Sequence, residues 1–238
     1  MPTLALDTTT REGSVALVVD GRIVAERRGD AARSHGERLP GELTDLLVGA
    51  GTTLDAIDLF AVAAGPGSFT GLRIGIATMQ GLALVAGRSI VPVFALDALA
   101  HAAADRLAAG SVVGTWMDAQ RGDVFSALYQ VQDGAPSSLD RLVLLEEASV
   151  GAPGDTVVRW RARRDGMPEV VVGDGAVRYR DAWAGLGGPA VRIMEPSPLA
   201  GTVGRLAEAA AARGEAVAPM AVRPLYVRRP DVVVARER

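Results

Sequence analysis

The segment DTTTREGSVALVV (residues 7–19) has a counterpart in DAQRGDVFSALYQV (residues 118–131). In each segment an aspartate ends one apolar run, a short polar turn follows, and a second apolar run returns. Short β-branched and apolar runs on either side of a turn are typical of an antiparallel hairpin. Two such hairpins, about 110 residues apart, predict a duplicated architecture.

The rest of the chain alternates strand and helix patterns around these hairpins. Strands are predicted at residues 3–10, 13–20, 22–28, 58–64, 89–94, 112–120, 124–131 and 191–193, and a strand followed by a glycine turn is predicted at 169–176. Helices are predicted after the Ser34–Glu37 capping box, after Gly67, from Asp97 to near Gly110, and from Leu199 to Arg213. This order predicts a two-lobed α/β protein. We expect lobes at residues 1–98 and 99–238, with the last helix or tail packing back on the first lobe.

The composition excludes several kinds of site. All 25 basic residues are arginine, so no Walker, Schiff-base or general-base lysine exists. The chain has no cysteine, which excludes disulfides and thiolate chemistry. A net charge of −3 gives no electrostatic reason to expect tight nucleic-acid binding by this chain alone. We expect neither a signal peptide nor a membrane span.

A glycine-rich segment, GPGSFTGLRIGIATMQGLA (residues 65–83), follows a predicted strand and enters a helix. It does not fit a Walker loop, because the spacing differs and the lysine is missing. A dinucleotide fingerprint fits Gly65 and Gly67 but fails at Thr70, although Asp97 follows the next strand as an acidic partner would. A dinucleotide-binding oxidoreductase is therefore an alternative function.

The glycines of this segment have a second interpretation. Gly67, Gly71 and Gly75 recur every four residues and so share one helix face. Glycine in a helix interior costs about 0.5–1 kcal/mol relative to alanine, so three together need a compensating close approach of another backbone. That backbone belongs either to the chain's own sheet or to a partner subunit, and the pattern alone leaves both open.

The two hairpin turns are candidate phosphate-binding positions. A strand that ends in aspartate and enters a hydroxyl-rich turn can hold phosphate oxygens or metal-bound water, and two facing turns could hold a polyphosphate. The turn VGDGA (residues 172–176) could lie on the adenosine side of the same site. The structural alternative is that the threonines hydrogen-bond the local backbone. The candidate positions are Asp7, Thr8, Thr9, Thr10, Gly13, Ser14 and Asp118.

Other candidate sites are weaker. His35 and His101, the two histidines, lack the i, i+4 spacing of a helical metal site, and we expect no metal. No catalytic set and no nucleophile-elbow motif is recognisable. The run RWRARR (residues 159–164) reads either as a nucleic-acid contact or as a solvated charged face.

Several segments together resemble one family. They are LALDTTT…GSVAL, SHGERL, AAGPGSFTGLRIGIATMQGLA, MDAQRGDVFSALY and LYVRRPD, and they closely resemble the TsaB family, also called YeaZ. The resemblance extends nearly to Arg229, and GPGSFTGLRIG is its most specific block. It implies the two-lobed actin-like ATPase (ASKHA) fold with duplicated mixed-sheet lobes.

The resemblance also implies a role. TsaB is a cytoplasmic, non-catalytic scaffold that activates its paralogue TsaD, which carries the metal. TsaD makes N6-threonylcarbamoyladenosine (t6A) beside the anticodon of tRNAs that read codons beginning with A. TsaC supplies the threonylcarbamoyl-adenylate and the ATPase TsaE binds the pair. This chain would then meet tRNA only through the complex, contact no membrane, and pair with itself where TsaD is absent. The chain itself would require no cofactor. ATP or ADP would bind, if at all, at the interface of the complex.

Family members pair through two helices of the first lobe. Carried over by position, the interface residues are His35, Arg38, Leu39, Leu43, Gly71, Arg73, Ile74, Gly75 and Met79. On this interpretation the glycines chiefly let the helices of two subunits approach. An independent actin-like ATP-dependent kinase remains the main alternative function.

Overall fold

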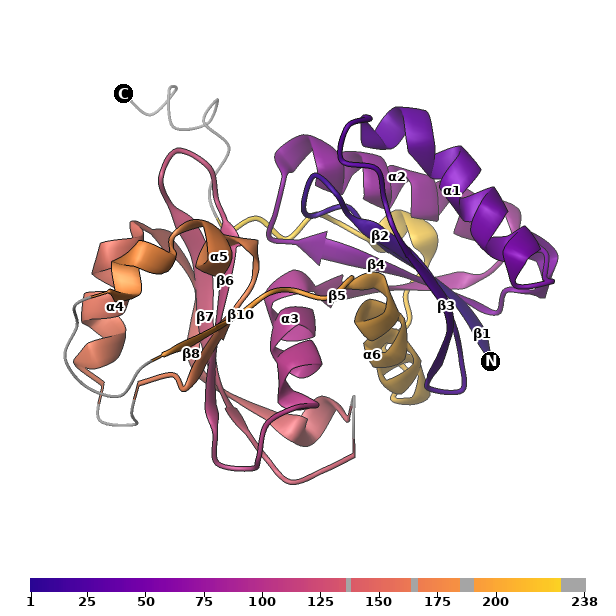
Figure 1. The fold of residues 1–238 in the computed structure, drawn as a ribbon. Coiled ribbons are helices and arrows are strands. Elements are labelled where there is room, and N and C mark those ends of the chain that lie inside the picture. The colour runs from indigo at the N-terminus through magenta and orange to yellow at the C-terminus, as the bar shows by residue number, and fades with distance from the viewer. Residues whose placement is uncertain (136–137, 164–166, 185–190, 228–238) are drawn as a thin grey trace.

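Two five-stranded mixed sheets form the frame of the protein (Figure 1). The structure is a computed structural model, and it describes residues 1–135, 138–163, 167–184 and 191–227. The first sheet has the order β3-β2-β1-β4-β5 and the second has the order β10-β9-β6-β7-β8. The strands are β1 Pro2–Asp7, β2 Ser14–Val19, β3 Arg22–Arg28, β4 Leu59–Gly65, β5 Ser89–Phe94, β6 Val112–Asp118, β7 Val124–Val131, β8 Leu142–Gly151, β9 Val170–Val172 and β10 Arg192–Met194.

The two sheets have the same connectivity. β1 pairs antiparallel with β2 and parallel with β4, and β6 pairs antiparallel with β7 and parallel with β9. In the first hairpin Asp7 lies opposite Ser14, and in the second Asp118 lies opposite Val124. The predicted duplication of a mixed-sheet α/β lobe is therefore confirmed.

Six α-helices lie within the described residues. They are α1 His35–Gly49, α2 Phe69–Val85, α3 Ala95–Ala104, α4 Pro153–Arg161, α5 Asp174–Arg178 and α6 Ala200–Ala212. Short 3-10 turns occur at Leu54–Ala56, Leu139–Arg141, Arg180–Trp183 and Pro219–Ala221. The predicted capping box starts α1, where the Glu37 carboxylate accepts a hydrogen bond from the Ser34 N–H at 2.9 Å.

Residue size decides which helices cover each face of the first sheet. Large side chains such as Leu4, Leu6 and Phe60 share one core with α1 and α2. Small side chains such as Ala5 and Ala61 point to the opposite face and share a core with α3 and α6. Because successive strand residues point to opposite faces, the alternation of small and large side chains decides which pair of helices packs on each face.

Helices α3 and α6 lie between the two sheets (Figure 1). Although α6 comes late in the chain, it contacts β1, β2 and β4 of the first sheet, while α3 contacts β6 of the second. The expected boundary between residues 98 and 99 falls inside α3. The two helices therefore join the lobes rather than belonging to separate ones.

Some elements differ from the sequence-based expectation. Helix α3 starts at Ala95 and ends at Ala104, short of Gly110, and Asp97 does not cap it, because its carboxylate accepts a hydrogen bond from the Tyr129 hydroxyl at 2.6 Å. The segment 169–176, predicted as a strand and a glycine turn, forms β9 and then the start of the short helix α5. The edge strand β8 and helix α4 were not predicted.

Candidate functional site

The two hairpin turns are built in the same way. In the first, the Thr9 N–H and hydroxyl both donate to Asp7 Oδ1, at 2.8 and 2.6 Å. In the second, the Gln120 N–H donates to Asp118 Oδ1 at 2.9 Å. Each aspartate thus closes an Asx turn onto the residue two positions later. The duplicated aspartates stabilise the two turns, and this engages one carboxylate oxygen of each that a metal site could otherwise use.

The two turns line one cleft between the lobes. The cleft has a volume of about 1060 Å³ and is lined by Thr9 and Thr10 from the first turn and by Asp118 from the second. The start of α2 and Asp174 complete it. The predicted meeting of the two turns and the 172–176 segment is therefore present.

Burial governs the acidic groups beside this cleft. Asp174 Oδ1 accepts hydrogen bonds from the backbone N–H groups of Asp118 and Gly175, at 3.1 and 2.9 Å. Burial raises the pKa of Asp174 and that of Asp7, and these hydrogen bonds and those from Thr9 only partly oppose the rise. The Asp174 charge contributes further to the raised pKa of Asp7. A ligand whose phosphates lay beside these two carboxylates would need additional positive charge to offset the repulsion.

Three of the candidate phosphate positions have structural roles. Ser14 Oγ accepts the backbone N–H groups of Leu199 and Ala200, at 3.1 and 2.9 Å, and so caps the start of α6. Gly13 has φ +60° and leaves no room for a side chain beside the Asp7 carbonyl. Thr8 is fully buried and lines neither the cleft nor the smaller cavity of about 280 Å³ beside Asp7. Gly13 and Ser14 do line this smaller cavity, and the expectation that these positions bind phosphate stays a prediction.

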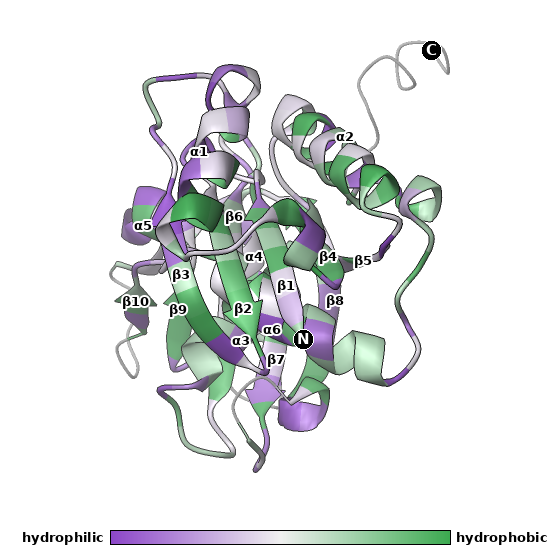
Figure 2. Cartoon of the chain, turned by 90° about the vertical axis from the view of Figure 1, so that its right-hand side faces the viewer, coloured by the Kyte–Doolittle hydropathy of each residue, from purple (hydrophilic) through white to green (hydrophobic). Residues whose placement is uncertain are grey.

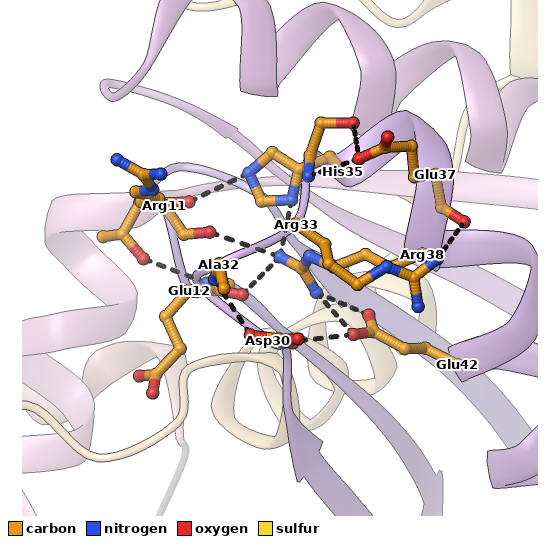
Figure 3. A network of polar contacts seen from close by, with 12 residues as sticks. Arg11, Glu12, Asp30, Ala32, Arg33, His35, Glu37, Arg38 and Glu42 are labelled. Atoms are coloured by element: carbon orange, nitrogen blue, oxygen red, sulfur yellow. Dashed lines mark hydrogen bonds and ion pairs between the residues drawn. The ribbon is translucent and has the colours of Figure 1, made fainter.

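Arg38 joins α1 to the first hairpin turn (Figure 3). Its Nη1 donates to both carboxylate oxygens of Glu42, at 2.7 and 2.6 Å. Its Nη2 donates to the carbonyl oxygens of Arg11, at 3.3 Å, and of Glu12. The side chain is almost completely buried, so this guanidinium fixes the turn from inside the lobe.

His35 extends the same network (Figure 3). Its Nδ1 accepts from Arg38 Nη2 at 2.7 Å, which places the proton on Nε2, and Nε2 donates to the Thr10 carbonyl at 3.0 Å. Burial, together with the neighbouring Arg38 charge, lowers the pKa of His35. The neutral ring therefore positions the turn at the edge of the cleft.

The glycine face of α2 lies against the chain's own first turn. A methyl group on Gly75 would overlap the Thr8 hydroxyl, and one on Gly71 would overlap the Thr8 carbonyl. On Gly67 it would overlap Thr9. The glycines thus admit the β1–β2 turn, which corrects the interpretation that they open space for a partner helix.

Most residues carried over as the partner interface are buried within this chain. These are His35, Arg38, Leu39, Leu43, Gly71, Gly75 and Met79, whereas Arg73 is exposed and Ile74 is half-buried. Carrying positions over on the helices did not distinguish the inner face from the outer face. The expectation that these seven residues contact a second protein directly is therefore corrected, because their side chains are buried within this chain.

The outer face of α2 is apolar. Ala77, Gly81, Leu84 and Val85 are exposed and follow one another at helical spacing, with Leu84 60% and Val85 83% exposed. Figure 2 shows hydrophobic colouring along much of α2. A methyl group on Gly81 would meet no other atom within 4 Å, so this glycine, unlike Gly75, faces open space. The spacing of the glycines in the sequence did not distinguish Gly81 from Gly75.

An aromatic pair at the cleft escaped the sequence-based prediction. The rings of Phe69 and Tyr226 stack with centroids 5.6 Å apart. The Arg73 guanidinium lies 3.8 Å from the centroid of Phe69, and its Nε donates to the Tyr226 hydroxyl at 3.2 Å. The contact joins residues that are far apart in the sequence, so no local pattern could have indicated it.

The RWRARR run is mostly committed to packing. Arg159 and Arg163 form ion pairs with Glu146 at 2.9 and 3.3 Å, and Trp160 is buried with its Nε1 donating to the same carboxylate. A buried indole is not available to stack on a base. Arg164 lies outside the described residues, as do residues 228–231 of the LYVRRPD segment.

Metal-ligand clusters and membrane-spanning helices are both absent from the described part of the chain. Within it, no three His, Cys, Asp or Glu side chains gather closely enough to hold a metal ion. Over the same ranges, no helix has the length and hydrophobicity that a membrane span requires.

Known proteins match both halves of the chain. The model of the family described as TsaD, tRNA N6-adenosine threonylcarbamoyltransferase, matches residues 26–155. TsaB of Escherichia coli, named as a tRNA threonylcarbamoyladenosine biosynthesis protein, is 41% identical over 130 residues. The solved structure of YeaZ from Pseudomonas aeruginosa is 33% identical, covers 94% of this chain and 99% of its own, and has a TM-score of 0.76. The chain belongs to the TsaB/YeaZ family.

Coverage differs among the family members. The E. coli TsaB alignment covers 55% of each protein, so the chain matches about half the length of that relative. An uncharacterized protein of Mycobacterium tuberculosis is 31% identical over 96% of this chain and 92% of its own length. The two-lobed arrangement shared with YeaZ of P. aeruginosa therefore extends across most of the chain.

Proposed function

We propose that this chain acts in the synthesis of N6-threonylcarbamoyladenosine on tRNA. Its role is that of a non-catalytic subunit that pairs with a TsaD-type threonylcarbamoyltransferase and activates it. The substrates of the complex are tRNAs that read codons beginning with A. Support for the pathway comes from relatives named TsaB in threonylcarbamoyladenosine biosynthesis.

The outer face of α2 is the observation that carries the pairing. Ala77, Gly81, Leu84 and Val85 leave apolar surface in water on a helix whose other face is already buried. Exposed apolar surface of this kind marks interaction sites in soluble proteins. Small residues in the middle of the face, at 77 and 81, let a partner helix approach closely. Arg73 and Ile74 extend the face toward the cleft.

A supporting rather than catalytic role agrees with the chemistry of the turns. The carboxylates of Asp7 and Asp118 already accept hydrogen bonds within their own turns. The described residues present no cluster of metal-ligating side chains. Threonylcarbamoyl transfer is then assigned to the partner. ATP or ADP at the interface of the complex, a TsaE-type ATPase, and self-pairing where TsaD is absent belong to the same proposal, as does a cytoplasmic location.

Native mass spectrometry tests the pairing. The chain is mixed with the TsaD-type protein of its own organism, and we expect a heterodimer. The Ala77→Glu variant places a charge in the apolar face and should weaken the heterodimer at least about tenfold, because the carboxylate must be desolvated or excluded. Val158→Glu, at another exposed apolar position on α4, is the matched control and should pair normally. Equal pairing by both variants would place the interface elsewhere.

A further inference from the structure

The cleft between the lobes is positively charged although the chain is not. Its charged lining comprises four arginines, Arg11, Arg33, Arg121 and Arg178, and two aspartates, Asp118 and Asp174, and Arg178 forms an ion pair with Asp118 at 3.5 Å. The net charge of the whole chain is −3. The arginines come from four separate segments: the first turn, the loop before α1, the second turn and α5. A locally cationic hollow on an acidic protein favours an anionic ligand.

The aromatic pair lies in the same cleft. Phe69 and Tyr226 both line it, and they are 43% and 40% exposed. Stacked aromatic rings that remain exposed offer a surface on which unpaired bases stack. Guanidinium groups combine charge for phosphate with a planar face for stacking, and every cation of this chain except its N-terminus is of that type.

The chemistry does not favour a metal–nucleotide complex. The Asp118 carboxylate accepts from Gln120 N–H and lies 3.2 Å from the Tyr179 hydroxyl, and Asp7 is closed onto Thr9. Arginines spread around the cleft suit single phosphates along a strand. The volume of about 1060 Å³ is at the upper limit of pockets for one small molecule.

We propose that this cleft binds a single strand of RNA. A base stacks against Tyr226, since Phe69 is already in contact with Tyr226 and Arg73, and the backbone phosphates meet the arginines of the rim, Arg33 and Arg178 among them. The inference uses only the cleft's own residues and is independent of pairing through α2. If the proposed function holds, the strand belongs to the substrate tRNA, and this subunit touches it directly.

Fluorescence anisotropy with a labelled eight-nucleotide single-stranded RNA tests the proposal on the full chain. At low salt we expect weak, saturable binding that declines steeply as salt is added. The Arg33→Ala/Arg178→Ala variant should bind at least about tenfold less tightly, with the log–log salt slope reduced by about 0.7 per lost phosphate contact. Both side chains are exposed, so the fold should persist, which circular dichroism would verify.

The matched control is Arg88→Ala/Arg213→Ala. It removes the same charge from exposed arginines that each face an aspartate, Asp58 and Asp140, outside the cleft. The control should keep the affinity and salt slope of the unmodified chain to within about twofold. Equal losses in the cleft and control variants would overturn the proposal, because binding would then follow net charge alone.

Tyr226 separates stacking from simple charge attraction. Tyr226→Phe keeps the ring and should bind RNA normally, whereas Tyr226→Ala should bind about fivefold or more weakly. Equal binding by both variants would overturn the stacked-base arrangement. Fluorescent ADP with Mg²⁺ is the second probe, and its binding more tightly than the RNA would overturn the assignment to a strand. The measurement needs no TsaD-type partner, so it can fail while the pairing proposal stands.

Discussion

Gly75 of α2 lies directly against Thr8 of the first hairpin turn, with no room for a side chain between them. Thr8 is fully buried, and its hydroxyl has no hydrogen-bond partner among the described residues. The glycine-rich segment therefore serves packing inside the lobe: it lets the turn lie against the helix, while Leu84 and Val85 on the outer face of the same helix stay exposed.

Gly75→Ala should destabilise the isolated chain. The added methyl group meets the Thr8 hydroxyl, and overpacking of this kind costs roughly 1–3 kcal/mol. Thr8→Ala should restore much of that loss in the double variant, because it removes the overlapping atom. The measurement is the free energy of unfolding in urea for both single variants and the pair.

Gly71→Ala supplies the control for this cycle. Its methyl group would meet the Thr8 carbonyl, which Thr8→Ala retains, so no rescue is expected. Gly81→Ala should instead stabilise the chain by up to about 1 kcal/mol, since its position is open and alanine is the better helix former. If Gly75→Ala is as stable as Gly81→Ala, the inward orientation of the glycine face is wrong.

Arg38→Ala should lower the free energy of unfolding by roughly 2–3 kcal/mol. It leaves two turn carbonyls and the Glu42 carboxylate without their donor, and Glu42 is only partly solvated. Arg38→Lys should recover little, because an ammonium cannot reproduce the forked contacts. Arg33→Ala, an exposed neighbour, should change stability by less than about 0.5 kcal/mol. Full rescue by lysine would show that only the charge matters.

Acid should destabilise the chain through His101. Burial in α3 lowers its pKa from 6.5 to about 4, with Arg205 and Arg141 also lowering it and Asp105 opposing them. The unfolded chain then takes up the proton first, so this contribution is present above pH 6.5 and is lost as the pH falls toward 4. The loss is on the order of 3 kcal/mol.

His101→Gln isolates that contribution. Asp7, Glu26, Asp97 and Asp174 have raised pKa values and act in the opposite direction, so the wild-type curve alone mixes both signs. The difference in urea stability between wild type and His101→Gln should shrink as the pH falls from 6.5 to 4. A difference that stays constant across this range would contradict a buried neutral His101.

Local patterns sufficed for much of the fold. The Ser34–Glu37 box acts over a few residues, and β3 and β5 appear with the expected bounds. Strand β8 was missed because it is an irregular edge strand whose pairing with β7 shifts register twice, so no clean alternation marks it. Helix α4 was not predicted, because its arginines were interpreted as a charged surface.

The site was less predictable because it depends on orientation. Helical spacing placed Gly71 and Gly75 on one face correctly, but only the position of Thr8 shows that this face points inward. Similarly, the sequence indicated that Asp7 and Asp118 end equivalent strands, whereas their Asx turns show how the carboxylates are used. The Phe69–Tyr226 pair requires the path of the chain after α6.

A reconstituted modification reaction tests the proposed role most directly. Unmodified tRNA that reads a codon beginning with A is incubated with a source of threonylcarbamoyl-adenylate and the TsaD-type protein, with and without this chain, and the nucleosides are analysed by mass spectrometry. We expect N6-threonylcarbamoyladenosine only when both proteins are present, none from this chain alone, and little with Ala77→Glu. Equal product without this chain, or product from this chain without the TsaD-type protein, would contradict the role of a non-catalytic activating subunit.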